Sequence, residues 1–180
     1  MSVTERLLTG RGSTTQFYPQ PRTIFVKTLL DQQQLSDGVA RMAGEINQHY
    51  GSRPLTIIGV LTGSVVLMAD LIRKLEMPLR VGVVQTSSYK GTERGALTIN
   101  AEMMLDITGR DVLLIDDIFD TGHTLNEVTE LMRELGPTSL QSAVLLLKTG
   151  RQEVDWKPEF VAFDIPDEFV VGYGLDFNDE

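Results

Sequence analysis

Short apolar runs alternate along the chain with longer stretches in which apolar residues are spaced at regular intervals. The run "PLTIIGVL", residues 54–61, is almost continuously apolar, which is typical of a strand buried on both faces. Between Asp31, which is placed to cap a helix, and Gly51, which is placed to end it, apolar residues recur at spacings of four, three and four. This spacing predicts an amphipathic helix. Its apolar residues are Leu35, Val39, Met42 and Ile46.

The same alternation continues to the end of the chain. Strands that alternate with helices favour a mostly parallel, twisted sheet flanked by helices, so we predict an α/β fold. In such sheets ligands bind outside the carboxyl ends of the strands. Further helices are predicted over residues 65–75 and 125–135, and further strands over residues 23–30, 79–89, 111–115, 139–148, 160–165 and 168–175.

The first 22 residues do not follow this alternation. They are rich in Gly, Ser, Thr and Pro, and they lack the apolar segment of a secretory signal. We expect residues 1–22 to form an irregular N-terminal arm. Residues 23–180 have the length of a single domain with one sizeable core, and they contain no internal repeat or linker.

Composition and charge exclude several classes of function. The formal net charge of -9 argues against a nucleic-acid or anionic-membrane partner. The chain has no cysteine, which excludes disulfides and thiolate metal sites and is compatible with a reducing compartment. No run reaches the ~20 apolar residues of a membrane span. We therefore expect a cytoplasmic protein without a nucleic-acid or membrane partner.

Three carboxylates follow one predicted strand closely, in the segment "DVLLIDDIFDTGHTLN". Asp116, Asp117 and Asp120 lie within five residues, and their mutual repulsion and desolvation need an offset. Mg²⁺ or sugar hydroxyls bound by Asp116 and Asp117 supply one, since Mg²⁺ prefers oxygen ligands. Asp120 is available for another task, such as accepting a proton. The alternatives are loop acids in solvent and a receiver-type acidic pocket.

The residues after Asp120 have the composition of a phosphate-binding loop. Thr121, Gly122, His123 and Thr124 lie where a strand gives way to a helix, and there the first backbone N–H groups lack partners within the helix. Glycine allows the backbone to approach a ligand closely, and the threonines add hydroxyl groups. The alternative is an ordinary helix start that Thr121 or Thr124 caps.

The segment "VLLIDDIFDTGHTL" resembles the phosphoribosyl diphosphate signature of type I phosphoribosyltransferases: two acids, two hydrophobic residues, a third acid and then TG-x-T. Three other segments are similar to parts of hypoxanthine-guanine phosphoribosyltransferases: "VLTGSVVLMADLIRKL" to the pyrophosphate loop and its helix, "SSYKGT" to the mobile catalytic loop, and "LLLKTG…WKPEFVAFDIPDEFVVGYGLDF" to the purine-binding end. The resemblance covers roughly residues 23–180. It implies the type I phosphoribosyltransferase fold, with a small purine-binding hood built from the chain ends.

The resemblance implies transfer of a 5-phosphoribosyl group from phosphoribosyl diphosphate to hypoxanthine, and we expect to guanine also, giving IMP or GMP and pyrophosphate. Asp116 and Asp117 would orient the ribose hydroxyls, directly or through Mg²⁺. Asp120 would lie near purine N7 as the catalytic acid/base. The 5-phosphate would be bound by five residues, which are Asp120, Thr121, Gly122, His123 and Thr124.

The same resemblance assigns the base and pyrophosphate sites. Lys148 would donate to the exocyclic oxygen of the purine, which explains a preference for 6-oxopurines over adenine. Phe169 would stack on the base, and Val170 would bind its edge through the backbone. Asp176 would bind a second Mg²⁺ together with pyrophosphate. The pyrophosphate loop would consist of Leu61, Thr62, Gly63 and Ser64.

Ser88 and Tyr89 correspond to the family's mobile loop, which would close over the site and exclude water. The chain departs from the family pattern at two places. The family often has Lys where Thr62 stands, and its members usually continue past Glu180 with an aromatic residue and an arginine that contacts pyrophosphate. Thr62 removes one cation from the expected pyrophosphate site, and a protein that ended at Glu180 would lack the arginine as well.

Two other functions are compatible with the same fold. One is a xanthine-guanine-type phosphoribosyltransferase, and the other is a non-catalytic regulator that binds RNA or senses nucleotides. Asp120 and the net charge of -9 argue against the regulator. Since the family commonly forms dimers or tetramers, the resemblance also implies a homo-oligomer.

Overall fold

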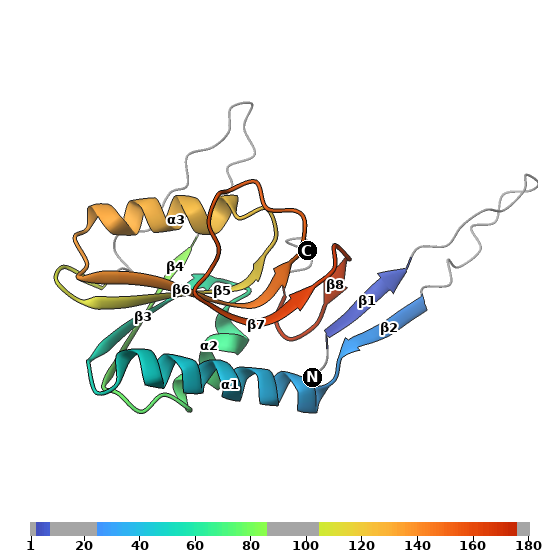
Figure 1. Cartoon of the computed structure of the whole chain (residues 1–180), viewed down its shortest axis with the longest axis horizontal. Coiled ribbons are helices and arrows are strands. Elements are labelled where there is room, and N and C mark those ends of the chain that lie inside the picture. The colour runs from blue at the N-terminus through green and yellow to red at the C-terminus, as the bar shows by residue number, and fades with distance from the viewer. Residues whose placement is uncertain (1–2, 8–24, 86–104, 176–180) are drawn as a thin grey trace, which may run out of the picture.

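The computed structural model describes residues 3–7, 25–85 and 105–175. Its centre is a five-stranded parallel sheet with the strand order β4-β3-β5-β6-β7 (Figure 1). This sheet confirms the predicted α/β fold. Its strands are β3 (Leu55–Leu61), β4 (Leu79–Gln85), β5 (Asp111–Phe119), β6 (Ser139–Lys148) and β7 (Phe160–Ile165).

Helices cover both faces of this sheet. α1 (Gln32–Tyr50) and α2 (Val65–Ile72) lie on one face, and α3 (His123–Glu134) lies on the other (Figure 1). Asp31 caps α1 as predicted, because its carboxylate accepts a 2.8 Å hydrogen bond from the backbone N–H of Gln34. Among the described helices, none is long and apolar enough to cross a membrane.

The central strand β5 contributes to two hydrophobic cores. Leu113 and Ile115 belong to the core shared with α1 and α2, whereas Val112 and Leu114 belong to the core shared with α3. All four are fully buried, which explains why this strand is apolar without alternation. The strand continues to Phe119, so Asp116 and Asp117 belong to the strand itself and inherit its rigidity.

A second, antiparallel sheet joins the two ends of the chain. Its strand order is β2-β1-β8, from β1 (Val3–Leu7), β2 (Phe25–Leu30) and β8 (Val170–Val171). The prediction of an irregular arm over residues 1–22 is therefore wrong for β1. This strand is stabilised by a distant partner, since Glu5 pairs with Val170, and a single short segment carries no signal of that pairing. β8 is also shorter than the strand predicted over residues 168–175.

Candidate active site

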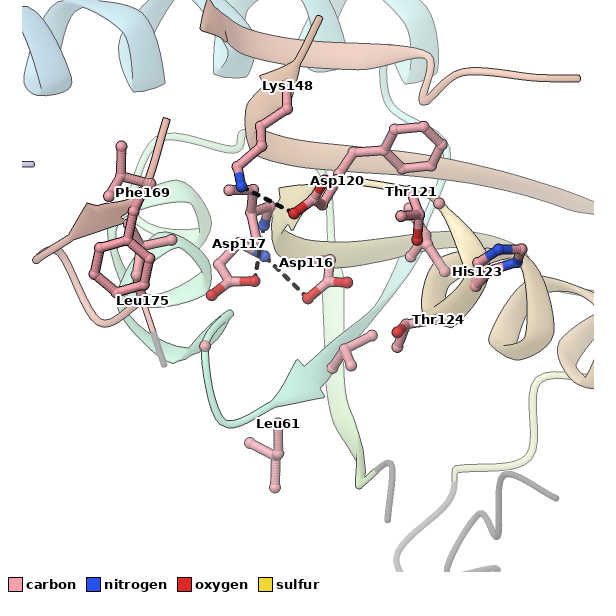
Figure 2. A pocket seen from close by; sticks show the side chains of 17 residues that line it. Leu61, Asp116, Asp117, Asp120, Thr121, His123, Thr124, Lys148, Phe169 and Leu175 are labelled. Carbon is pink, nitrogen blue, oxygen red and sulfur yellow. Dashed lines mark hydrogen bonds and ion pairs between the residues drawn. The ribbon is translucent and has the colours of Figure 1, made fainter. Parts of the chain in front are cut away.

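A cavity of about 410 Å³ opens at the carboxyl ends of β3, β5 and β6, which is where the parallel sheet predicted a ligand site. In Figure 2, Phe169 and Leu175 lie on one side, Thr121, His123 and Thr124 lie on the other, and the acidic residues lie between them. The predicted site residues that line it are Leu61, Gly63, Asp116, Asp117, Asp120, Thr121, Gly122, His123, Thr124, Lys148, Phe169 and Val170.

Two predicted site residues that the structure describes do not line the cavity, and three others lie outside the described residues. Thr62 and Ser64 belong to the same loop as Leu61 and Gly63 but do not line the cavity. Ser88, Tyr89 and Asp176 lie outside the described residues.

The start of α3 forms an anion-binding cradle of backbone groups. Gly122 precedes the helix with a φ of 90°, and the first helical hydrogen bond, of 2.9 Å, runs from Asn126 N–H to its carbonyl. The N–H groups of His123 and Thr124 precede that bond, and they therefore lack a partner within the helix. No side chain caps this described helix start, so the alternative of an ordinary threonine cap does not hold.

The segment after β6 supports the cradle from outside. The backbone N–H of Glu153 donates a 2.9 Å hydrogen bond to the carbonyl of Thr121, and Glu153 Oε2 lies 2.7 Å from His123 Nε2. A Cβ on Gly122 would fall 2.5 Å from Val154 Cγ2 and 2.6 Å from Phe119 Cζ, so this position has no space for a side chain. Glycine is therefore required at Gly122 both by its φ and by its surroundings.

Asp116 and Asp117 form a buried carboxylate pair beneath the cavity, with exposed fractions of 8% and 9%. Asp116 Oδ1 accepts a 3.0 Å hydrogen bond from the N–H of Asp117, whose Oδ1 accepts a 2.7 Å bond from the N–H of Ile118. These bonds fix both carboxylates. Their repulsion at low exposure favours a bound cation or a ligand rich in hydroxyl groups.

The donor set at Asp116 and Asp117 fits Mg²⁺. The described residues contain no cluster of three or more acidic or histidine side chains that would enclose a metal ion. Mg²⁺ does not require one, because it keeps several waters and is usually bound by one or two carboxylates together with substrate phosphates. A hard cation of this kind also offsets the repulsion between the two buried carboxylates.

Gly63 brings the loop after β3 against this carboxylate pair. A Cβ at Gly63 would overlap the Asp117 carboxylate, so only glycine allows this approach. The peptide bond between Leu61 and Thr62 is cis. Ser64 is fully buried, and its backbone N–H donates a 3.3 Å hydrogen bond to the carbonyl of Val60. Its N–H is therefore bonded within the turn that leads into α2.

Asp120 and Lys148, which both line the cavity, form an ion pair that Figure 2 shows as a dashed line. Lys148 Nζ donates a 2.9 Å hydrogen bond to Asp120 Oδ2, and only 10% of the lysine side chain is exposed. Two side chains that the sequence did not point to join them. Arg151 Nε lies 3.1 Å from Asp120 Oδ1, and Asp167 Oδ1 lies 3.8 Å from Lys148 Nζ.

The hydrophobic wall opposite consists of residues from the last part of the chain. Phe169 lines the cavity with 49% of its surface exposed, so its ring is accessible to a ligand. Val170 is held by its pairing with β1. Trp156 packs on the α3 side of the sheet, with its ring 5.4 Å from that of Phe119.

Tyr173 ties this wall to α2, the helix that follows the loop of Leu61 and Gly63. It is 6% exposed, and its hydroxyl donates a 2.6 Å hydrogen bond to Asp70 Oδ2. Burial first, and then this bond to a carboxylate, raise the pKa of the Tyr173 hydroxyl, so it stays a donor at neutral pH. This hydrogen bond therefore joins the C-terminal segment that carries Phe169 to the helix that follows the loop of Leu61 and Gly63.

The sequence did not point to three charged residues beside the cavity, which are Arg151, Glu153 and Asp167, or to five residues that line it, which are Val60, Ile118, Phe119, Leu125 and Leu175. The first two lie in a polar segment between β6 and β7 that has no periodic pattern. Leu175 fell within a predicted strand, where its side chain had no distinguishing signal. Two of them could have been found from their distance in sequence to predicted site residues. Arg151 comes three residues after Lys148, and Asp167 comes two residues before Phe169.

A family model described as the phosphoribosyl transferase domain matches residues 26–178. The chain is 40% identical to the hypoxanthine-guanine phosphoribosyltransferase of Staphylococcus epidermidis over 153 residues, which are 84% of this chain and 86% of that protein. It is 36% identical to the hypoxanthine phosphoribosyltransferase of Haemophilus influenzae over 157 residues, which are 84% of this chain and 88% of that protein.

Solved structures agree with these relatives. The hypoxanthine-guanine phosphoribosyltransferase of Bacillus anthracis, with HEPES in its active site, superposes with a TM-score of 0.78 and 34% identity over 86% of this chain and 90% of that one. The hypoxanthine phosphoribosyltransferase of Trypanosoma cruzi in complex with IMP gives 0.75 and 34% identity, over 82% of this chain and 84% of that one. The chain therefore belongs to the phosphoribosyl transferase domain family.

Proposed function

We propose that the protein is a purine salvage enzyme that transfers 5-phosphoribosyl from phosphoribosyl diphosphate to hypoxanthine, and to guanine, with release of pyrophosphate. The observation that carries this proposal is the cavity of about 410 Å³, which combines a helix-start anion cradle, a buried carboxylate pair and an acid–lysine pair beside an exposed phenylalanine. Relatives at 36–40% identity that are named for hypoxanthine or hypoxanthine-guanine support the choice of base.

The 5-phosphate is bound at the start of α3. The backbone N–H groups of Thr121, Gly122, His123 and Thr124 bind it together with the Thr124 hydroxyl, and the dipole of α3 adds partial positive charge. The side chain of His123 is not required, because its imidazole lies against Glu153. Fixing the phosphoribosyl group in this way lowers the activation barrier, because the reactants no longer have to meet in solution. In the best intramolecular reactions this effect is worth roughly 7–11 kcal/mol.

Asp116 and Asp117 hold the ribose hydroxyls and would hold Mg²⁺. When bound, Mg²⁺ neutralises charge on the diphosphate leaving group. Asp176 is the proposed ligand of a second Mg²⁺. The loop of Leu61, Thr62 and Gly63 lies next to Asp117 and receives the pyrophosphate.

The base lies between Phe169 and the Asp120–Lys148 pair. Phe169 stacks on the purine, and the backbone of Val170 binds its edge. Lys148 donates to the exocyclic oxygen O6, where adenine would present an amino group instead, so the site selects 6-oxopurines. Ser88 and Tyr89 close over the reactants and exclude water.

Asp120 handles the proton of the purine. As N9 bonds to C1′ and pyrophosphate leaves, the proton on N7 must be removed, and the Asp120 carboxylate is the acceptor. The position of Asp120 supports this role. It comes directly before the phosphate cradle, and it accepts a hydrogen bond from Lys148, the proposed base-binding residue.

The test is an assay of nucleotide formation from phosphoribosyl diphosphate and Mg²⁺, with hypoxanthine, guanine, xanthine, adenine and uracil run side by side. IMP and GMP are identified by chromatography, and EDTA is the control for metal. We expect metal-dependent turnover of hypoxanthine and guanine without turnover of adenine or uracil. Preferred turnover of xanthine would favour the xanthine-guanine-type enzyme, and no turnover with any base would contradict the proposal.

We further propose that residues 23–180 act as one domain and that the protein is a homo-oligomer. In a Trypanosoma cruzi hypoxanthine phosphoribosyltransferase of known structure, the C-terminal region has a role in oligomeric state and enzymatic activity. This similarity supports the proposal that the present chain also assembles. Light scattering on the purified full chain measures the state, and a monomer at micromolar concentration would contradict the second part.

A further inference from the structure

Arg151 makes two contacts that link parts of the site far apart in sequence. Its Nε lies 3.1 Å from Asp120 Oδ1, at the end of β5. Its Nη1 donates a 3.2 Å hydrogen bond to Asp167 Oδ1, two residues before Phe169. The contact with Asp120 is an ion pair and not a hydrogen bond, because Asp120 Oδ1 has no hydrogen-bond partner among the described residues.

Arg151 and Lys148 bind different oxygens of the same carboxylate. Lys148 Nζ donates to Asp120 Oδ2 at 2.9 Å, while Arg151 faces Oδ1. Lys148 also lies 3.8 Å from Asp167, so two cations alternate with two carboxylates around the base side of the cavity. Because Asp120 and Asp167 each contact both cations, one cation can move away and both carboxylates still have a cationic neighbour.

The proposed reaction requires Lys148 to make this change. To donate to purine O6, its ammonium must turn away from Asp120, and a lysine ammonium can do so because it sits on a flexible stem. Arg151 is suited to stay, since its planar guanidinium is always charged and contacts two carboxylates at once. Asp120 would then keep a cationic neighbour and a fixed orientation while it accepts the N7 proton.

We propose that Arg151, acting with Asp167, is a positioning residue of this enzyme. It holds Asp120 in place through Oδ1 when Lys148 turns to the base, and it ties Asp120 to the segment that carries Phe169. The inference rests on the proposed function. The alternative is that Arg151 and Asp167 form an ion pair without a role in the reaction. Their side chains are 45% and 50% exposed, and ion pairs at such exposure are common on protein surfaces, so the test must separate the two roles.

The test compares Arg151→Gln, Arg151→Lys and Arg133→Gln in steady-state kinetics with hypoxanthine. Arg133 is the matched control, because it forms an exposed 2.7 Å ion pair with Glu130 on α3 and lines no part of the cavity. We expect Arg151→Gln to lower kcat on the order of 10-fold, as for supporting partners of functional residues. The KM for phosphoribosyl diphosphate should change less than about 2-fold, and Arg151→Lys should recover part of the loss.

A double variant separates positioning from a general effect of charge. If Arg151 acts through Asp167, the double variant Arg151→Gln with Asp167→Asn should be little worse than Arg151→Gln alone. Should Arg151→Gln fail to fold, Asp167→Asn removes the same link from its other end and carries the same expected loss of kcat.

The outcomes distinguish this inference from the proposed function. If the unmodified protein and Arg133→Gln form no nucleotide, the proposed function fails. If both are active and Arg151→Gln has an unchanged kcat, or if it changes only the midpoint of unfolding, the positioning role is wrong.

Discussion

The proposed phosphate side and the proposed base side of the cavity are built in different ways. The phosphate side comes from one continuous stretch, residues 116–124, and its donors are backbone groups at the start of α3. The base side is assembled from separate segments, with Lys148 at the end of β6, Arg151 after it and Phe169 near the end of the chain. Its contacts are mostly between side chains, and several of these are ion pairs.

This difference has a consequence for how each side responds to a ligand. Backbone N–H groups fixed by a helix need little rearrangement to receive a phosphate. In the proposed reaction, the Asp120–Lys148 pair, which is joined by a hydrogen bond in the free protein, instead exchanges partners when a purine binds. The phosphate side should therefore be sensitive to backbone shape, and the base side should be sensitive to charge.

The largest effect is expected at Asp120, where the two sides meet. Asp120→Asn removes the proton acceptor and should lower kcat roughly 10²–10⁴-fold, the usual contribution of general acid–base catalysis. Binding of phosphoribosyl diphosphate, measured by calorimetry, should change little. The control is Asp37→Asn, which alters an exposed aspartate on α1 that accepts from Gln33. Unchanged turnover in Asp120→Asn would remove this residue from the acid/base role.

Lys148→Met should damage the base side alone. The loss of a hydrogen bond from a charged donor costs about 1.5–3 kcal/mol, which corresponds to a rise of about 10- to 150-fold in the KM for hypoxanthine. Initial-rate kinetics with each substrate varied in turn measure this, and the exposed Lys157→Met is the control. If hypoxanthine is still preferred over adenine as strongly as before, the O6 contact is not the source of selectivity.

Gly122→Ala should damage the phosphate side alone. The added Cβ meets Val154 and Phe119 at 2.5–2.6 Å, and the φ of 90° disfavours alanine. We expect a stability loss of about 1–3 kcal/mol and a KM for phosphoribosyl diphosphate raised on the order of 10-fold. Gly44→Ala on α1 is the matched control, because its Cβ would meet nothing within 4 Å and should stabilise the helix by roughly 0.5–1 kcal/mol. Equal behaviour of the two variants would contradict the shape argument.

Tyr173→Phe should have the smallest effect on activity. It removes the 2.6 Å hydrogen bond to Asp70 that joins the last described segment of the chain to α2, while Asp70 keeps its ion pair with Arg73. Denaturant unfolding should report a loss of roughly 1–2 kcal/mol. A fall in kcat larger than that of Lys148→Met would mean that the link transmits more than stability.

How much the sequence could predict differs between the same two sides. The structure brings the contiguous residues 116–124 to one cavity, as the end of a strand followed by the start of a helix predicted, and their roles in binding stay predictions. The fold was predicted for the same reason, since each parallel strand carries its own apolar run. Local pattern is sufficient where the feature is local.

The charged residues next to Lys148 and the small antiparallel sheet could not be predicted from local pattern, because they are formed by contacts between distant segments. Arg151 and Asp167 are separated by 16 residues, and neither stands out from other surface charges until β6 and β7 bring them together. β1 was missed for a similar reason, because its partners are β2 and β8. Ser64 was assigned to the cavity from a motif, but the turn into α2 directs its N–H to Val60 instead.

The most direct test of the division between the two sides is a crossed measurement on Gly122→Ala and Lys148→Met. The KM for phosphoribosyl diphosphate and the KM for hypoxanthine are determined for each variant beside the unmodified protein. The account predicts that Gly122→Ala raises the first constant and leaves the second nearly unchanged, and that Lys148→Met does the reverse. If both variants raise both constants to the same extent, the cavity does not have two separable sides and the assignment of its residues is wrong.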